Sequence, residues 1–266
     1  MKKLTLALLL IFSCSTAWAA DFDKGLAAYD AGDFATALAE WGPLAVLGDA
    51  SSQYNLGLMY DNGEGVIEDD EEAVMWFRLA AEQGHETAQY NLGLMYDNGE
   101  GVIEDDEEAV MWFRLAAEQG FAGAQYNLGN MYDNGEGVIE DHKEAVKWYR
   151  LAAEQGIAVA QFNLGNMYDK GEGVIKEDKE VVRLYRLAAE QGYADAQSNL
   201  AIKYATGQGV IEDNVYAHMW FNIAASNGSE NANKGKDFLA KSMTLQDISK
   251  AQDLARECVK KNYKDC

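Results

Sequence analysis

The stretch QYNLGLMYDNGEGVIEDDEEAVMWFRLAAEQG, residues 53–84, recurs letter for letter at residues 89–120. The same frame continues more loosely from Gln125, Gln161 and Gln197, so a step of 36 residues is repeated five times. A fixed period of about 20–50 residues is the signature of a solenoid, in which each unit packs against its neighbours. The repeat therefore predicts the fold class, and the question of function becomes one about surfaces.

Each unit has the pattern of two helices separated by a glycine turn. In residues 87–120, apolar side chains such as Leu92 and Tyr96 fall at helical spacing on one stripe of a first helix. The segment 98–101, Asn-Gly-Glu-Gly, ends that helix, since glycine tolerates the left-handed geometry of a C-terminal cap. We therefore expect a first helix near residues 51–61 in the first copy.

The second helix of the unit begins at an acidic cap. Asp105 and Glu108 have the spacing of a capping box, with Asp in place of the usual Ser or Thr. Behind them, Trp112 and Phe113 alternate with small alanines on a stripe that we expect to be buried. The corresponding helix of the first copy is expected near residues 70–83. A lone helix pair cannot bury both of its stripes, so the units must stack.

This pattern resembles the Sel-1-like repeat family, a relative of tetratricopeptide solenoids. The residues that carry the resemblance are Ala88, Leu92, Gly93, Tyr96, Gly99, Gly101, Val102, Asp105, Ala109, Trp112, Ala116, Ala117 and Gly120, and their pattern extends over about residues 22–232. The resemblance implies an all-α, right-handed α/α superhelical solenoid of five helix-turn-helix repeats with helical caps. It also implies a non-enzymatic adaptor that binds other proteins without a cofactor, and we expect a monomer.

The chain divides into four segments. We expect a signal peptide at residues 1–19, an N-terminal tetratricopeptide-like cap at 20–49, the five repeats at 50–229 and a C-terminal helical cap at 230–266.

The first segment has the composition of a secretory signal. Lys2 and Lys3 precede a short apolar run, and Ala17 and Ala19 provide a small-residue cleavage site after residue 19. The predicted location is the periplasm, with secretion as an alternative. Two other interpretations stay open: an N-terminal anchor helix, and a lipoprotein cleaved before Cys14.

Net charge and apolar content exclude some classes of partner, and the cysteines indicate the redox compartment. The net charge of −22 disfavours nucleic acid, because non-specific binding to phosphates needs Lys and Arg. No second apolar run approaches membrane-spanning length, so we expect no membrane insertion. Cys258 and Cys266 are the only cysteines after residue 19 and are candidates for a C-terminal disulfide in an oxidising compartment.

The strongest candidate site lies on the first helices. If the tetratricopeptide geometry applies, the positions two before and two after the repeated leucine point into a concave groove. These positions are Tyr54, Leu58, Tyr90, Leu94, Tyr126, Asn130, Phe162 and Asn166. A row of aromatic rings beside amides suits an extended peptide or a partner's helix. The alternative is that the rings are core residues packed against the second helix of the preceding unit.

Other functions have weaker support in the sequence. Binding of peptidoglycan or another glycan is the main alternative, because rows of Tyr and Asn also suit sugar rings; a cell-wall hydrolase or β-lactamase-like enzyme is less favoured. His85, His142 and His218 share no repeat position, and no catalytic motif accompanies them. The acidic run 68–72 ends a segment, 61–72, that has the length of a calcium loop, but Gly63 and Gly65 stand where oxygen ligands are required, so we predict no metal site.

Overall fold

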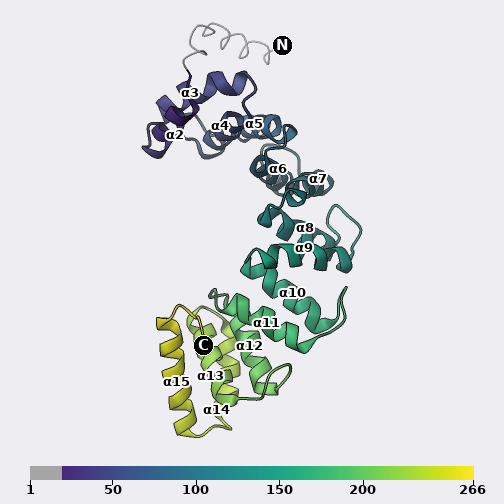
Figure 1. Cartoon of the computed structure of the whole chain (residues 1–266), viewed down its shortest axis with the longest axis vertical. Coiled ribbons are helices and arrows are strands. Elements are labelled where there is room, and N and C mark those ends of the chain that lie inside the picture. Colours follow the sequence, from purple (N-terminus) through teal and green to yellow (C-terminus); the bar gives the residue numbers. More distant parts are fainter. Residues whose placement is uncertain (1–19) are drawn as a thin grey trace. The chain divides into compact units, whose positions relative to one another are not determined.

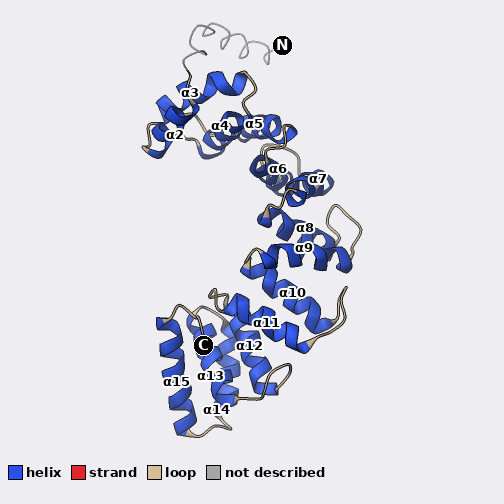
Figure 2. Ribbon diagram, in the orientation of Figure 1, coloured by secondary structure: helices blue, strands red, loops and turns tan. Residues whose placement is uncertain are grey.

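The chain is built from helices that follow one another in pairs. The computed structural model describes residues 20–266, and the expected signal peptide at residues 1–19 lies outside this range. The described residues form helices α2–α15 and contain no strand (Figures 1 and 2). This confirms the predicted all-α repeat fold. No helix within residues 20–266 has the length and apolar character needed to cross a bilayer.

The contacts between residues divide the chain into two compact units. The N-terminal unit runs to Ala124 and includes Glu136–Val138, and the C-terminal unit consists of Gln125–Gly135 and Ile139–Cys266. The N-terminal unit contains α2 (Phe22–Asp30), α3 (Phe34–Val46), α4 (Ala50–Asn62), α5 (Asp70–Glu82), α6 (Glu86–Asn98) and α7 (Asp106–Glu118). Helix α8 (Ala122–Asn134) begins at the boundary. The C-terminal unit continues with α9 (His142–Glu154), α10 (Ala158–Lys170), α11 (Asp178–Ala189), α12 (Ala194–Thr206), α13 (Asn214–Ser226), α14 (Glu230–Ala240) and α15 (Leu245–Lys260).

The turn between the helices of a repeat forms as the sequence predicts. Helix α6 ends at Gly99, which adopts a left-handed φ of 71° and donates its backbone N–H to the Met95 carbonyl. Helix α7 begins after Asp105, whose carboxylate accepts a hydrogen bond from the Glu108 N–H at 3.1 Å. The first copy repeats this geometry with Gly63 as its cap. The two helix termini are thus set by local signals in the sequence.

A second glycine of the turn lets successive repeats touch. Gly101 has a φ of 66°, and a Cβ atom there would lie 2.2 Å from the Asp70 carbonyl oxygen at the start of α5. The loop of one repeat therefore rests on the first turn of the preceding repeat's second helix. The equivalent contacts join Gly137 to Asp106, Gly173 to His142 and Gly209 to Asp178.

Buried glutamines form polar links between neighbouring repeats. Gln89, which is 4% exposed, donates its side-chain amide to the Ala81 carbonyl of the preceding repeat at 3.0 Å. Its side-chain oxygen accepts a hydrogen bond from Gln119, at the end of the second helix of its own repeat, at 2.7 Å. Gln161 makes the same two bonds, and Gln197 makes equivalent ones with Asn227 in place of the second glutamine. A buried amide is stable only when paired, so these bonds fix how successive helices stack.

The apolar core follows the same period. Trp112 is 5% exposed and belongs to a cluster formed mainly by α5 and α6, the helices that precede its own. Leu184 occupies the equivalent position on α11 and lies in a cluster with residues of α9 and α10. Within each unit, α7 and α11 therefore pack against both their own first helix and the second helix of the repeat before.

The C-terminal cap departs from the repeat. Helices α14 and α15 both pack against α13, the second helix of the fifth repeat. Cys258 and Cys266 form a disulfide with a Cα–Cα distance of 5.5 Å, which ties the last residues to the end of α15. The cap therefore closes the apolar face of the last repeat with α14, which begins 36 residues after α12, and with α15, which departs from the 36-residue period.

Candidate functional site

The eight candidate residues lie on the first helices of four repeats. Tyr54 and Leu58 belong to α4, Tyr90 and Leu94 to α6, Tyr126 and Asn130 to α8, and Phe162 and Asn166 to α10. All eight side chains are half-buried. They are therefore neither fully enclosed core residues nor freely exposed ones.

Three aromatic members of the row have ring contacts on two sides, and the Tyr126 ring lies 6.1 Å from the Tyr149 ring. The Tyr90 ring lies 5.8 Å from the Phe113 ring of its own repeat and 4.8 Å from Phe121, just before the next first helix. Tyr54 makes the matching contacts with Phe77 and His85, and Phe162 with Tyr185 and Tyr193. These contacts differ from the alternative raised from the sequence, because the helix contacted belongs to the same repeat rather than to the preceding one. These contacts hold the rings, which stay partly accessible to solvent.

The second member of each candidate pair differs between the two units. In the N-terminal unit it is Leu58 or Leu94, and the second helix of the same repeat carries the buried rings of Phe77 or Phe113. In the C-terminal unit the same two positions hold asparagine and tyrosine. The Tyr149 hydroxyl donates to the Asn130 side-chain oxygen at 2.7 Å, and Tyr185 donates to Asn166 at 2.7 Å. The second position of each pair is thus apolar in the first two repeats and polar in the next two.

A column of asparagines connects successive first helices. The Asn163 amide of α10 donates to the Asn130 oxygen of α8 at 3.4 Å. Burial raises the pKa of Tyr54, and a hydrogen bond with Asn91 of the next repeat acts in the opposite direction. The asparagines therefore brace the row by linking successive first helices.

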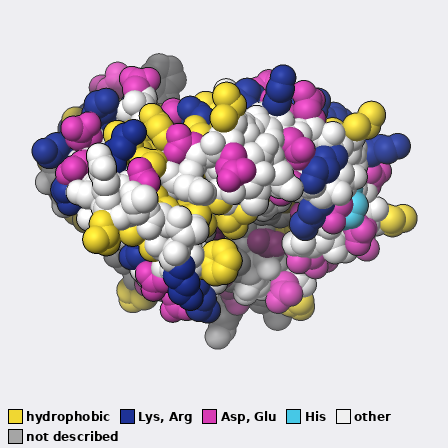
Figure 3. All heavy atoms as spheres, turned by 90° about the horizontal axis from the view of Figure 1, so that it is seen from below, with side chains coloured by type: hydrophobic (Ala, Val, Ile, Leu, Met, Phe, Trp, Pro, Cys, Tyr) yellow, Lys and Arg dark blue, Asp and Glu magenta, His cyan; other side chains and the backbone are white. Residues whose placement is uncertain are grey.

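The loops between helices carry uncompensated negative charge in the N-terminal unit. Burial raises the pKa of Asp61, and the nearby charges of Asp70, Glu100 and Glu68 raise it further. The pKa of Asp97 is raised in the same way by burial and by Asp106, Glu136 and Glu104. On the face shown in Figure 3, Asp and Glu side chains (magenta) lie among Lys and Arg side chains (dark blue).

In the fourth repeat, two lysines neutralise the equivalent carboxylate: Lys176 belongs to the same repeat, and Lys203 lies on α12. Lys203 Nζ lies 2.8 Å from both carboxylate oxygens of Asp169, and Lys176 Nζ lies 3.1 Å from one of them. Burial opposes ionisation of Asp169, but the hydrogen bonds from these two lysines lower its pKa. The first two repeats hold acids where the fourth holds Lys176, so their clusters lack this compensation.

The three histidines lie in separate local environments. His85 caps α6 by accepting from the Ala88 N–H at 3.2 Å, and His142 lies 3.1 Å from Asp133. His218 is 2% exposed, and burial lowers its pKa. Within residues 20–266, no three His, Cys, Asp or Glu side chains are grouped to hold a metal ion.

A set of exposed isoleucines was not recognised from the sequence. Each inter-helix loop places one isoleucine almost wholly in solvent: Ile67, Ile103, Ile139, Ile175 and Ile211 are 87–91% exposed. The available signal was their recurrence after a valine in every loop, next to polar neighbours. Every repeat therefore has one almost wholly exposed apolar side chain outside the candidate row.

Comparison with known proteins identifies the repeat. The Sel1 repeat model matches residues 50–85, 87–121, 122–157, 158–193 and 194–229. A Sel1 repeat protein from Oxalobacter formigenes is 34% identical with a TM-score of 0.79, and the match covers 89% of this chain and 99% of that chain. None of the curated proteins matches the chain.

Two further solved structures are more distant. A protective antigen of uropathogenic Escherichia coli strains with an SLR fold is 27% identical over 91% of this chain and 69% of that chain, with a TM-score of 0.45. An immunity protein from Pseudomonas aeruginosa is 19% identical over 80% of this chain and 82% of that chain, also with a TM-score of 0.45. These TM-scores are too low to support an inference about this chain.

Proposed function

Because the chain belongs to the Sel1 repeat family, we propose that it is a non-enzymatic scaffold that binds a partner protein or peptide along its first helices. Sel1 repeats are protein–protein interaction modules, and the family is a non-enzymatic repeat scaffold. The proposed surface consists of Tyr54, Leu58, Tyr90, Leu94, Tyr126, Asn130, Phe162 and Asn166.

The observation that carries the proposal is the row of fixed aromatic rings. The Tyr90 ring is held between Phe113 and Phe121, yet part of its surface stays accessible. A side chain that is already immobilised loses little conformational entropy when a partner binds. Aromatic residues also provide a large contact area, which makes them common binding anchors.

The difference between the two units suggests the character of the partner. Leu58 and Leu94 offer apolar contacts in the N-terminal unit, whereas Asn130 and Asn166 offer hydrogen bonds in the C-terminal unit. We therefore propose that apolar residues of the partner contact the first two repeats and that its polar groups contact the next two. An extended peptide or an amphipathic helix meets this requirement.

The internal differences between repeats provide a test that preserves the fold. Replacing Tyr90 by Ala would remove ring packing as well as the surface, so its effect on binding would be ambiguous. A better variant combines Leu58→Asn, Phe77→Tyr, Leu94→Asn and Phe113→Tyr, which reproduces in the first two repeats the pair seen in the third and fourth. Circular dichroism should show unchanged helicity, while the surface becomes polar.

The readout is capture of proteins from an envelope extract, identified by mass spectrometry. Proteins recovered with the wild type should be lost with the four-fold variant. The matched control is Met75→Asn with Met111→Asn, which places the same residue at 42%-exposed positions on the second helices of the same repeats. Recovery of the same proteins with both variants would show that the first-helix surface is not the binding site.

We also propose that the protein is exported to the periplasm. The support is the composition of residues 1–19, which the structure does not describe. Intact-mass measurement of protein from the envelope fraction should give a chain that starts at Ala20. A lipidated chain starting at Cys14, or a full-length cytoplasmic chain, would contradict cleavage after Ala19.

A further inference from the structure

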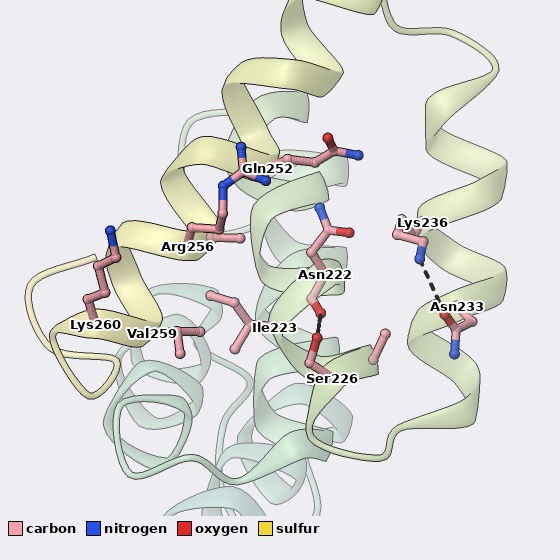
Figure 4. A pocket seen from close by; sticks show the side chains of 11 residues that line it. Asn222, Ile223, Ser226, Asn233, Lys236, Gln252, Arg256, Val259 and Lys260 are labelled. Atoms are coloured by element: carbon pink, nitrogen blue, oxygen red, sulfur yellow. Dashed lines mark hydrogen bonds between the residues drawn. The ribbon is translucent and has the colours of Figure 1, made fainter.

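A cleft in the C-terminal cap lies outside the five repeats. Helices α14 and α15 both pack against α13, and the three enclose a cleft of about 770 Å³ (Figure 4). Ile223 of α13 and Ala255 and Val259 of α15 supply its apolar lining. Its volume falls within the range of about 300–1,000 Å³ that is usual for binding pockets. The cleft is large enough to hold several residues of a bound segment.

The charge of the cleft is opposite to that of the chain. Lys236 of α14 and Arg256 and Lys260 of α15 line it, and no Asp or Glu does. Residues 230–266 contain eight Lys and Arg against six Asp and Glu, whereas residues 1–229 contain 14 against 38. The concentration of cations in one cleft of an acidic protein favours an anionic ligand.

The cations lie on both sides of the cleft. Lys236 Nζ donates to the Asn233 side chain at 3.3 Å, and both belong to α14 (Figure 4). Arg256 pairs with Asp253 of the same helix, and Asp253 lies outside the cleft lining. Carboxylates of a bound segment can therefore pair with cations from α14 on one side and from α15 on the other.

The base of the cleft offers groups that recognise a peptide backbone. Asn222 and Ser226 of α13 lie there, with Asn233 and Gln252 beside them. The Asn222 amide nitrogen is 2.9 Å from Nδ1 of the buried His218, and Ser226 Oγ donates to the Asn222 carbonyl at 3.0 Å. The contact with His218 holds the Asn222 side chain, whereas the Ser226 hydroxyl bonds to the Asn222 backbone. Side-chain amides both donate and accept hydrogen bonds, as peptide groups do.

We propose that this cleft binds an acidic peptide segment of a partner protein. Carboxylates of the segment pair with Lys236, Arg256 and Lys260, and its backbone bonds to the amides at the base. Apolar side chains of the segment lie against Ile223 and Val259. A long polyanion such as nucleic acid is disfavoured, because the rest of the chain repels it. The cleft is separate from the first-helix surface, so this proposal can be tested independently of the proposed function.

The test uses labelled peptides and the chain from residue 20 to residue 266. One fluorescein-labelled peptide alternates Glu and Leu, and a matched peptide carries Gln in place of Glu. Fluorescence anisotropy should show about tenfold tighter binding of the Glu peptide, as expected for a few exposed ion pairs, and the preference should fall at high salt. Equal affinity for the two peptides, or equally effective displacement by free glutamate, would overturn the assignment to an acidic peptide.

A matched pair of variants locates the binding. Lys236→Gln, Arg256→Gln and Lys260→Gln remove the three cations of the cleft. Lys234→Gln, Lys250→Gln and Lys261→Gln remove the same charge from the same part of the cap, outside the cleft. The first variant should lose about tenfold in affinity and the second less than about twofold. Equal losses in the two variants, with helicity retained, would show non-specific attraction and refute the cleft as the site.

Discussion

Alanine at Gly101 tests whether contact between a loop and the preceding repeat holds the stack together. Gly101 has a φ of 66°, and an added Cβ would lie 2.2 Å from the Asp70 carbonyl oxygen and 2.4 Å from its carbon. Left-handed backbone costs about 1–2 kcal/mol for a residue with a side chain. Carbon and oxygen atoms normally stay about 3.3 Å apart, so the two repeats must separate by about 1 Å. Such overpacking costs about 1–3 kcal/mol more.

The matched control is alanine at Gly120, in the same repeat. Gly120 has a φ of 100°, but nothing lies within 4 Å of the position of its Cβ. Gly120→Ala should therefore lower the free energy of unfolding by about 1–2 kcal/mol, the cost of the left-handed backbone alone. Gly101→Ala should lower it by about 2–5 kcal/mol, because the steric clash adds to that cost. Urea unfolding followed by circular dichroism measures both free energies. If the two variants unfold at the same urea concentration, the loop contact contributes nothing and the reasoning fails.

Four further outcomes are expected. Gln89→Leu should lower the free energy of unfolding by about 1–3 kcal/mol in urea titrations, because it leaves the Ala81 carbonyl and the Gln119 amide without their buried partner; an unchanged midpoint would refute this. Trp112→Ala should cost about 3–5 kcal/mol and broaden thermal unfolding measured by calorimetry, whereas Leu184→Ala, with its smaller side chain, should cost less; the reverse order would contradict the packing. The raised pKa values of Asp61 and Asp97 mean that the native state binds their protons more readily than the unfolded chain, so their contribution to stability falls as pH rises above their ordinary value of 3.8. Asp61→Asn with Asp97→Asn should therefore raise the urea midpoint at neutral pH and flatten its decline from acidic pH, and a lowered midpoint would disprove the repulsion. Replacing Cys258 and Cys266 by Ser should cost about 2–3 kcal/mol and accelerate hydrogen exchange at the end of α15, with little change in the repeats; uniform acceleration along the chain would show that the disulfide is not local.

The helix limits could be predicted almost to the residue. Residues 51–61 and 70–83 were expected to be helical, and the helices are Ala50–Asn62 and Asp70–Glu82. This accuracy has a physical cause, because a left-handed glycine and an acidic cap are local signals that act within a few residues. Because the repeat length is constant at 36 residues, the helix limits of one repeat predict those of the others.

The candidate row was located from the sequence, but its contacts were not. The link between Asn130 and Tyr149 joins residues 19 positions apart on different helices, and no local pattern encodes it. The cleft of the cap was missed for a different reason. Helix α14 keeps the 36-residue step, but α15 begins 31 residues after α13, so the packing of α15 on α13 could not be extrapolated from the units before it.

The identity of residues 53–84 and 89–120 gives the N-terminal unit two copies of the side chains that these residues present to solvent. Ile67 and Ile103, both 90% exposed, are one such duplicated pair. A partner with a single matching motif has two equivalent places to bind. A partner with two motifs at the right spacing binds the second one at an effective concentration set by its linker, which reaches the millimolar range for short flexible linkers. Duplicating the module therefore raises avidity for tandem motifs without any new contact.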